Sequence, residues 1–413
     1  MALLEQSGPD RELAMAYSSL SQLHMLGWRA AQGVEWGRRA IARARDAGDD
    51  EAVIHALTNI GTARIAAGDD AGEDDLAEAG ELALRAGFHD HAARALVNLA
   101  WSRVARHRYR EGLETAERGL EVADRFDLRS HVRYLLGIRA WAHLDTGEWE
   151  RAERDAEASL AVLNVAGTTS SHHPALLVLS RLLARRGDPR AGEPLDRAWA
   201  FAVAADEAQR LVPAAIARAE HAWLAGDTVA AREYAAGALA SAGPGVHPLF
   251  AGETAFWLWR AGGLGEVPPG VVGPWLRSVR GDARGAAAEW EAAGATFLAA
   301  DALAASDDPD DMRDALAAFD RLGAERCAAV LRARMRERGA AVPPVARAAA
   351  GPGGLTARQR EVLELVAEGL TNGQIAERLV ISERTVDHHV AAVLRKLGVS
   401  GRAEAAAALD SRG

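Results

Sequence analysis

The residue types best suited to chemistry gather near the C-terminus, in the segment SerGluArgThrValAspHisHis at 382–389. The pair His388–His389 could suggest a metal site. However, adjacent residues diverge by about 100° on a helix, so one ion rarely takes both, and no third ligand lies nearby in sequence. The same argument applies to His172–His173, in a predicted loop. We therefore expect no metal ion at either pair.

Other chemistries are restricted by residues that the chain lacks. Lys396 is the single lysine, so residues 1–395 hold no Walker A loop, no usual phospho-receiver domain and no Schiff-base lysine. Cys327 is the single cysteine, which excludes an internal disulfide and fits a reducing cytoplasm. We find no nucleophile elbow or metal-ligand spacing, so we expect neither an enzyme nor a cofactor, although 58 acidic residues leave room for isolated catalytic carboxylates.

Local signals predict four helices in residues 355–413. Capping boxes at Thr356–Gln359 and Thr371–Gln374 open the first two, and Ser382 caps the third. Gly369 is predicted to end the first helix and Gly398 the third. The fourth helix is predicted at about 401–411.

The second and third of these helices predict a helix-turn-helix, with Ala376 small where they cross. Such a motif places the start of its second helix in the major groove of DNA. The predicted core consists of Ile375, Leu379, Ile381, Val386, Val390, Val393, Leu394 and Leu397.

Four segments carry a family resemblance: LeuThrAlaArgGlnArgGluValLeu, GlnIleAlaGluArgLeu, SerGluArgThrVal and ArgLysLeuGlyVal. Residues 355–413 resemble the LuxR-type DNA-binding domain. AlaLeuAlaAlaPheAspArgLeuGlyAla at 315–324 is similar to the region before that domain in the large ATP-binding LuxR regulators. The ATPase domain of those proteins is missing here, so the chain is expected to be a short form or part of a longer product.

The resemblance implies roles for individual residues. Asp387, His388 and Ala391 are expected to read bases. Many family members carry a lysine where Asp387 stands. The carboxylate could accept from a cytosine amino group or hold a neighbouring arginine, and both interpretations stay open. Expected phosphate contacts are Thr371, Arg384, Thr385, Arg395 and Lys396.

The rest of the chain predicts a helical-repeat array. Turn signals at Gly68, Gly147, Gly187 and Gly226, with further turns near 27–28 and 107–109, recur every 39 to 41 residues. This pattern resembles tetratricopeptide repeats, which stack into a solenoid with a concave face. A small residue recurs five positions after four of these turns, at Gly112, Ala152, Gly192 and Ala231.

We predict four regions along the chain: TPR-like repeats at 1–243, a degenerate helical continuation at 244–338, a linker at 339–354 and the DNA-binding domain at 355–413. The basic stretch 326–338 is interpreted as a solvated helix face rather than a DNA contact. The eleven tryptophans lie between Trp28 and Trp290, and most are expected in the core rather than in a ligand groove. Of Trp257 and Trp259, one should point outward.

Charge also constrains the function. Residues 355–413 carry eight basic and eight acidic side chains, so the body holds the whole net charge of −10. DNA binding must then use a local patch. No apolar run or leader predicts a membrane segment, and the expected location is cytoplasmic.

The leading hypothesis is a sequence-specific transcription regulator whose repeats sense an unknown effector or protein. By resemblance it binds double-stranded DNA as a homodimer through its fourth helix and recruits RNA polymerase. The alternative is a TPR-like interaction scaffold with residual DNA binding. A third hypothesis is a sigma-factor-like protein that recognises promoters, but it is disfavoured because no second promoter-binding domain is found.

Overall fold

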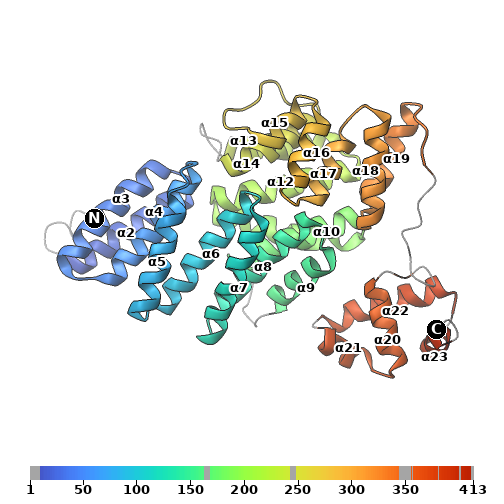
Figure 1. The fold of residues 1–413 in the computed structure, drawn as a ribbon, viewed down its shortest axis with the longest axis horizontal. Coiled ribbons are helices and arrows are strands. Elements are labelled where there is room, and N and C mark those ends of the chain that lie inside the picture. Colours follow the sequence, from blue (N-terminus) through green and yellow to red (C-terminus); the bar gives the residue numbers. More distant parts are fainter. Residues whose placement is uncertain are drawn as a thin grey trace.

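The computed structural model describes residues 10–161, 168–241, 248–343, 355, 357–379, 381–399 and 401–410 (Figure 1). The elements in these ranges are helices, which confirms the predicted all-α fold class. None of the described helices is both long and apolar enough to cross a membrane. The helices of the N-terminal body are α2 (Asp10–Leu26), α3 (Ala30–Ala47), α4 (Asp50–Ala66), α5 (Gly72–Ala86), α6 (His89–Ala105), α7 (Tyr109–Arg125), α8 (Arg129–Thr146), α9 (Trp149–Ala161), α10 (His173–Arg186), η1 (Pro189–Ala191), α11 (Gly192–Ala205), α12 (Ala208–Ala225) and α13 (Thr228–Ser241).

Left-handed backbone marks the end of the first helix in each helix pair. Glycine adopts this conformation without the steric cost that a Cβ atom brings. The predicted repeat of about forty residues is confirmed by these turns, although two of them use tryptophan and histidine. At these six turns the residue with positive φ is Trp28, Gly68, His107, Gly147, Gly187 or Gly226.

The first helices of successive pairs form an inner layer. Each even-numbered helix from α2 to α14 contacts the next even-numbered helix, and each also contacts its own odd-numbered partner. The inner helices are therefore buried on several sides, while an outer helix such as α7 buries one stripe of small residues. This arrangement gives the solenoid a concave inner face and a polar outer face.

Small residues allow close helix contact at three of the four predicted positions. A Cβ atom on Gly112 would lie 2.6 Å from Cγ2 of Val104, and Ala152 and Ala231 are fully buried. The prediction for Gly192 is wrong, because no atom lies within 4 Å of a Cβ built there. The short helix η1 shifts the start of α11, and its last residue, Ala191, is buried instead.

After α13 the chain forms a second layer that packs back on the repeats (Figure 1). The layer meets the ends of the inner helices. Trp28 stacks on Phe250 with ring centroids 5.8 Å apart, and His107 meets Trp290 edge-on at 4.6 Å. These two contacts explain why large side chains occupy left-handed turns. The helices of the second layer are α14 (Pro248–Arg260), α15 (Gly273–Val279), α16 (Ala283–Ala292), α17 (Thr296–Ala304), α18 (Pro309–Leu322) and α19 (Glu325–Glu337).

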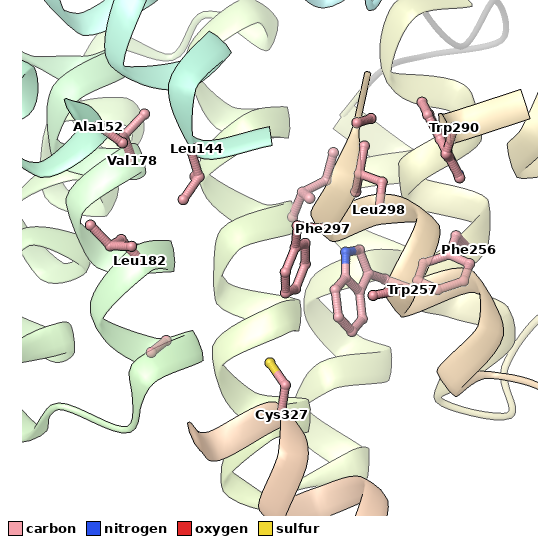
Figure 2. Close-up of a cluster of buried hydrophobic side chains, with 14 of the residues drawn as sticks. Leu144, Ala152, Val178, Leu182, Phe256, Trp257, Trp290, Phe297, Leu298 and Cys327 are labelled. Carbon is pink, nitrogen blue, oxygen red and sulfur yellow. The ribbon is translucent and has the colours of Figure 1, made fainter. Parts of the chain in front are cut away.

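One apolar cluster joins the two layers. Figure 2 shows Phe297 of α17 and Cys327 of α19 between Leu182 of the repeats and Trp257 of α14. Burial raises the pKa of the Cys327 thiol well above its usual range, so this cysteine is a packing residue. Trp257 is buried, and Trp259, two residues further on, is half-buried and packs against the same cluster.

The basic stretch 326–338 is only partly the predicted solvated face, because Arg336 and Arg338 are exposed but other arginines contact the body. Arg326 donates to the carbonyl oxygen of Leu224 (2.6 Å), and Arg332 pairs with Asp320 at 2.7 Å. The described arginines of α19 mostly attach this helix to α12, α18 and the loop after α17. The amphipathic pattern could not reveal this, because the partners are distant in sequence.

The C-terminal domain has its own core. Its helices contact one another, and two apolar clusters contain every residue that the sequence predicted for the core. The division of the chain into four regions stays a prediction. The predicted cap residue Thr356 and most of the predicted linker lie outside the described residues. The helices of this domain are α20 (Ala357–Ala367), α21 (Asn372–Leu379), α22 (Glu383–Leu397) and α23 (Arg402–Asp410).

Candidate DNA-binding surface

Side-chain caps fix where α21 and α22 begin. Thr371 and Gln374 form the predicted reciprocal box: the Gln374 amide donates to Thr371 Oγ1 (3.3 Å), and the Thr371 amide donates to Gln374 Oε1 (2.9 Å). Ser382 Oγ accepts from the Thr385 amide (3.1 Å). At the other end of α22, Gly398 has φ of +70°, as predicted. Local sequence chemistry thus defines both ends of the candidate reading helix.

The apolar cluster beneath the motif orients α22. Val386, on the inner face of α22, is fully buried together with Ile375 of α21. Ala376 is also buried where the helices cross, as the sequence predicted. With these residues turned inward, the opposite face of α22 is left for polar side chains.

The three expected base-reading residues lie on that opposite face. Asp387, His388 and Ala391 are all exposed. Their spacing places them along one side of the first two turns of α22. His388 Nδ1 donates to the Arg384 carbonyl oxygen (2.8 Å), which leaves Nε2 pointing to the other side of the ring. The structure brings the three residues together, but their role in base reading stays a prediction.

Asp387 also belongs to a polar network that sequence reasoning missed. Its carboxylate accepts from Asn372 of α21, and Asn372 in turn accepts from Arg402 of α23. Arg402 also donates to the Leu370 carbonyl oxygen (2.6 Å). The carboxylate is therefore linked to an arginine through an asparagine, an arrangement between the two interpretations left open above.

The expected phosphate contacts do not all have the same environment. Arg384, Arg395 and Lys396 are exposed on α22, and Lys396 Nζ donates to Gln359 Oε1 (2.8 Å). Thr371 is exposed at its cap. Thr385 is only 6% exposed.

Thr385 lies at a contact between the C-terminal domain and the repeat body. Its hydroxyl donates to Glu157 Oε1 of α9 at 3.4 Å, and the other oxygen of Glu157 is buried without a hydrogen-bond partner. Burial and the neighbouring Glu153 raise the pKa of Glu157 to about 7, although Arg358 opposes the shift. In this arrangement α9 lies against Thr385, one of the expected phosphate contacts.

His389 faces the same contact. Burial lowers the pKa of its imidazole, while the nearby carboxylate of Glu153 acts in the opposite direction. The two histidines of the pair therefore differ: His388 is exposed and His389 is half-buried. Nothing local in the sequence of α9 distinguishes Glu157 from other carboxylates, so only the folded chain identifies it.

Comparisons with known proteins concern this domain. Residues 354–409 match the family described as bacterial regulatory proteins, luxR family. The spore germination protein GerE of Bacillus subtilis (strain 168) is 49% identical over 51 residues, which are 12% of this chain and 69% of that protein. The DNA-binding transcriptional activator DevR/DosR of Mycobacterium tuberculosis is 41% identical over 81 residues, which are 20% of this chain and 34% of that protein.

The nitrate/nitrite response regulator protein NarL of Escherichia coli (strain K12) is 50% identical over 52 residues, which are 13% of this chain and 24% of that protein. The chain thus spans about a third of DevR/DosR and a quarter of NarL. Among solved structures, a circular tandem repeat protein with novel repeat topology aligns over 98% of both chains, at 17% identity and a TM-score of 0.21. That score is too low to support a statement about this fold.

Proposed function

Because the chain belongs to the luxR family of bacterial regulatory proteins, we propose that it is a sequence-specific transcription regulator whose α22 enters the major groove of double-stranded DNA. The observation that carries the proposal is the exposed row of Asp387, His388 and Ala391 on a helix capped at both ends. These side chains can reach base edges, because an α-helix fits the major groove.

The phosphate contacts follow from the same surface. Arg384, Arg395 and Lys396 supply positive charge along α22. Because the body carries the net negative charge, these side chains and the helix N-termini must provide the electrostatic attraction. A homodimer through α23, with half-sites about one helical turn apart, and recruitment of RNA polymerase come from the family resemblance.

The helical-repeat body supplies the control in this proposal. Its concave inner face is suited to an effector or a protein partner. The contact between Glu157 and Thr385 links that body to the reading helix, so occupancy of the body can alter DNA binding only if it changes this contact or the domain's orientation.

A second candidate function is an interaction scaffold with residual DNA binding. Two observations favour it: the acidic body and the contact of Glu157 with Thr385 of α22. The two candidates differ in whether the free chain binds specific DNA.

A gel-shift experiment with genomic fragments at several salt concentrations tests the proposal. We expect specific shifts, and the variant Arg395→Ala/Lys396→Ala should weaken binding to all sequences and reduce the salt slope by about two. Arg336→Ala, an exposed arginine of α19, is the matched control and should leave both quantities unchanged. Absence of any specific shift, with a slope near zero, would favour the scaffold.

A further inference from the structure

A groove runs along the inner face of the repeats. It has a narrow aromatic end, with about 630 Å³ between its lining atoms, and a wider polar end of about 1100 Å³, each including space open to solvent. The two ends share Trp101, Tyr134, Gln209 and Arg210, so they form one continuous space, here named the inner groove. Residues of α6, α8 and α12 line both ends, α10 and α14 line the aromatic end, and α2 and α4 contribute to the polar end.

The aromatic end is built to accept a flat apolar group. Trp101, Tyr134, Trp141 and Phe250 line it, and the three residues other than Phe250 are half-buried. Phe250 is held in place by Trp28, which stacks on it from the N-terminal turn. Four aromatic side chains around one space favour a ring by stacking and edge-to-face contact.

The floor of the aromatic end is electrically balanced. Arg181 donates from Nε to Glu220 Oε2 at 2.5 Å, and its Nη2 donates to Glu253. These pairs leave Arg181 no charge to offer a ligand. Any electrostatic preference must therefore come from other side chains of the inner groove.

Within the described part of the chain, two arginines of the inner groove have no carboxylate within hydrogen-bond distance and keep a buried N–H group without an acceptor. Arg210 is 8% exposed; its Nη1 donates to the Tyr134 hydroxyl, and its Nε is buried without a hydrogen-bond acceptor. The carboxylate paired with it is that of Glu207, whose Oε2 lies 3.6 Å from Arg210 Nε, beyond hydrogen-bond distance. A buried cation with an unsatisfied donor is costly unless a counter-charge is supplied.

Arg94 of α6 lines the polar end, to which Arg210 of α12 also contributes. Its Nη2 donates to Asn59 Oδ1 at 2.5 Å, and its Nη1 is buried without an acceptor. Among the described residues, no carboxylate oxygen forms an ion pair with it within 4.0 Å. Burial lowers the pKa of Arg94 to about 10, despite the opposing effect of Asp90, so the side chain remains charged at neutral pH.

We propose that the inner groove binds a small aromatic carboxylic acid. Its ring lies among Trp101, Trp141 and Phe250, and its carboxylate approaches the guanidinium of Arg210, with Arg94 adding positive potential. Guanidinium groups suit carboxylates because they donate in a planar fork. The inference rests on the proposed function, since it names the chemical class of the effector that the repeat body would sense.

Isothermal titration calorimetry on the full chain without DNA tests the inference. The probes are three acids and their amine counterparts: benzoate and benzylamine, indole-3-acetate and tryptamine, 2-naphthoate and 2-naphthylmethylamine. We expect at least one acid to bind, with its amine at least about tenfold weaker, which corresponds to one charge-assisted hydrogen bond.

Arg210→Gln and Arg94→Gln are the informative variants. Glutamine at position 210 keeps a donor for Tyr134 but removes the charge, and we expect acid binding to fall about tenfold. Arg39→Gln, in an exposed pair with Glu35 on the outer layer, is the matched control. Thermal melts verify that each variant is folded, and either arginine variant suffices if the other does not fold.

Three outcomes would overturn the inference: no acid of the panel binds, each acid binds no better than its amine, or both folded arginine variants bind like the parent chain. Because no DNA is present, these outcomes leave the proposed DNA binding untouched. Conversely, a failed gel shift together with selective acid binding would overturn the proposed regulator and not the groove.

Discussion

Ser382 and Asp387 decide how α22 presents its outer face. Ser382 satisfies the Thr385 amide at the start of the helix, where intrahelical acceptors are missing. Asp387 is held by Asn372 and so has a fixed carboxylate orientation. A capped helix start and a held carboxylate both reduce the ordering required when a ligand binds.

Ser382→Ala should destabilise α22 by about 1 kcal/mol, because the cap is lost. The tryptophans all lie outside this domain, so fluorescence would not detect the change. Hydrogen exchange of the α22 amides in the full chain is the suitable measurement. Ser382→Asp keeps an acceptor and should exchange like the parent; equal exchange in the alanine variant would contradict the prediction.

Asp387→Asn should shift the base preference of the protein. The asparagine can still accept from Asn372, but an amide pairs with adenine where a carboxylate accepts from cytosine. Selection of binding sites from a random DNA pool, with parent and variant in parallel, measures the shift. Unchanged sites would show that Asp387 supports Asn372 and Arg402 and does not read bases.

At the level of elements, buried ion pairs hold α10 against α12. Arg185 is 0% exposed, donates from Nε to Glu220 Oε1 at 2.6 Å, and lies 3.7 Å from the ring centroid of Phe297. Although burial raises it, the two arginines lower the pKa of Glu220 to about 2. The inner helices thus depend on a charge that would be costly if unpaired.

Glu220→Ala should destabilise the body by about 3–5 kcal/mol, because Arg181 and Arg185 lose their shared partner. In the parent, the lowered pKa means that this stabilisation is present above the ordinary pKa of a glutamate and is lost as the pH falls towards about 2. Denaturant unfolding at neutral and acidic pH measures both effects. Glu81→Ala, in an exposed pair with Arg85, is the control and should change little.

At the level of the whole molecule, the contact between α9 and α22 joins the repeat body to the reading helix. Glu157 lies near Glu153 of α9, Arg190 of η1, and Arg358 and Thr385 of the C-terminal domain, and Glu153 in turn interacts with His389. Burial and Glu153 of the same helix raise the pKa of Glu157 to about 7, whereas Arg358 and Thr385 of the C-terminal domain lower it. We expect the burial that this domain adds to exceed the two opposing effects, so that the covered arrangement, in which Glu157 contacts Thr385, binds a proton more readily than the open one. Covering is therefore favoured below about pH 7 and weakened as the pH rises through that value.

DNA affinity should rise as the pH increases from 6.5 to 8.5, because the covered arrangement becomes less stable. Glu157→Gln resembles the protonated carboxyl, so it should flatten this dependence and weaken binding at pH 8.5 by about tenfold. Fluorescence anisotropy with labelled DNA at constant ionic strength measures both quantities. Glu150→Gln, on the exposed side of α9, should behave like the parent; identical pH profiles for the two variants would disprove a role for Glu157.

Features that depend on neighbouring residues could be predicted from the sequence alone. The capping box at Thr371–Gln374, the cap at Ser382 and the glycine turns at 68 and 147 form as predicted, because their partners lie within a few residues. The exposed positions of α22 could be predicted because apolar residues recur at helical spacing on its opposite, inward face. The role of Asp387 could not be settled in the same way, because its partner belongs to another helix.

Only the tertiary structure decided what the long-range contacts do. In the folded chain the second layer packs back on the repeats, and Phe250 closes the inner groove. Arginines of α19 make contacts within the body, such as that of Arg326 with Leu224. The fold also places Glu157 against Thr385, 228 residues away in the chain. Caps and helical periodicity depend on residues a few positions apart, so they can be predicted from local sequence. These contacts join residues that are far apart in the chain, so no local pattern predicts them.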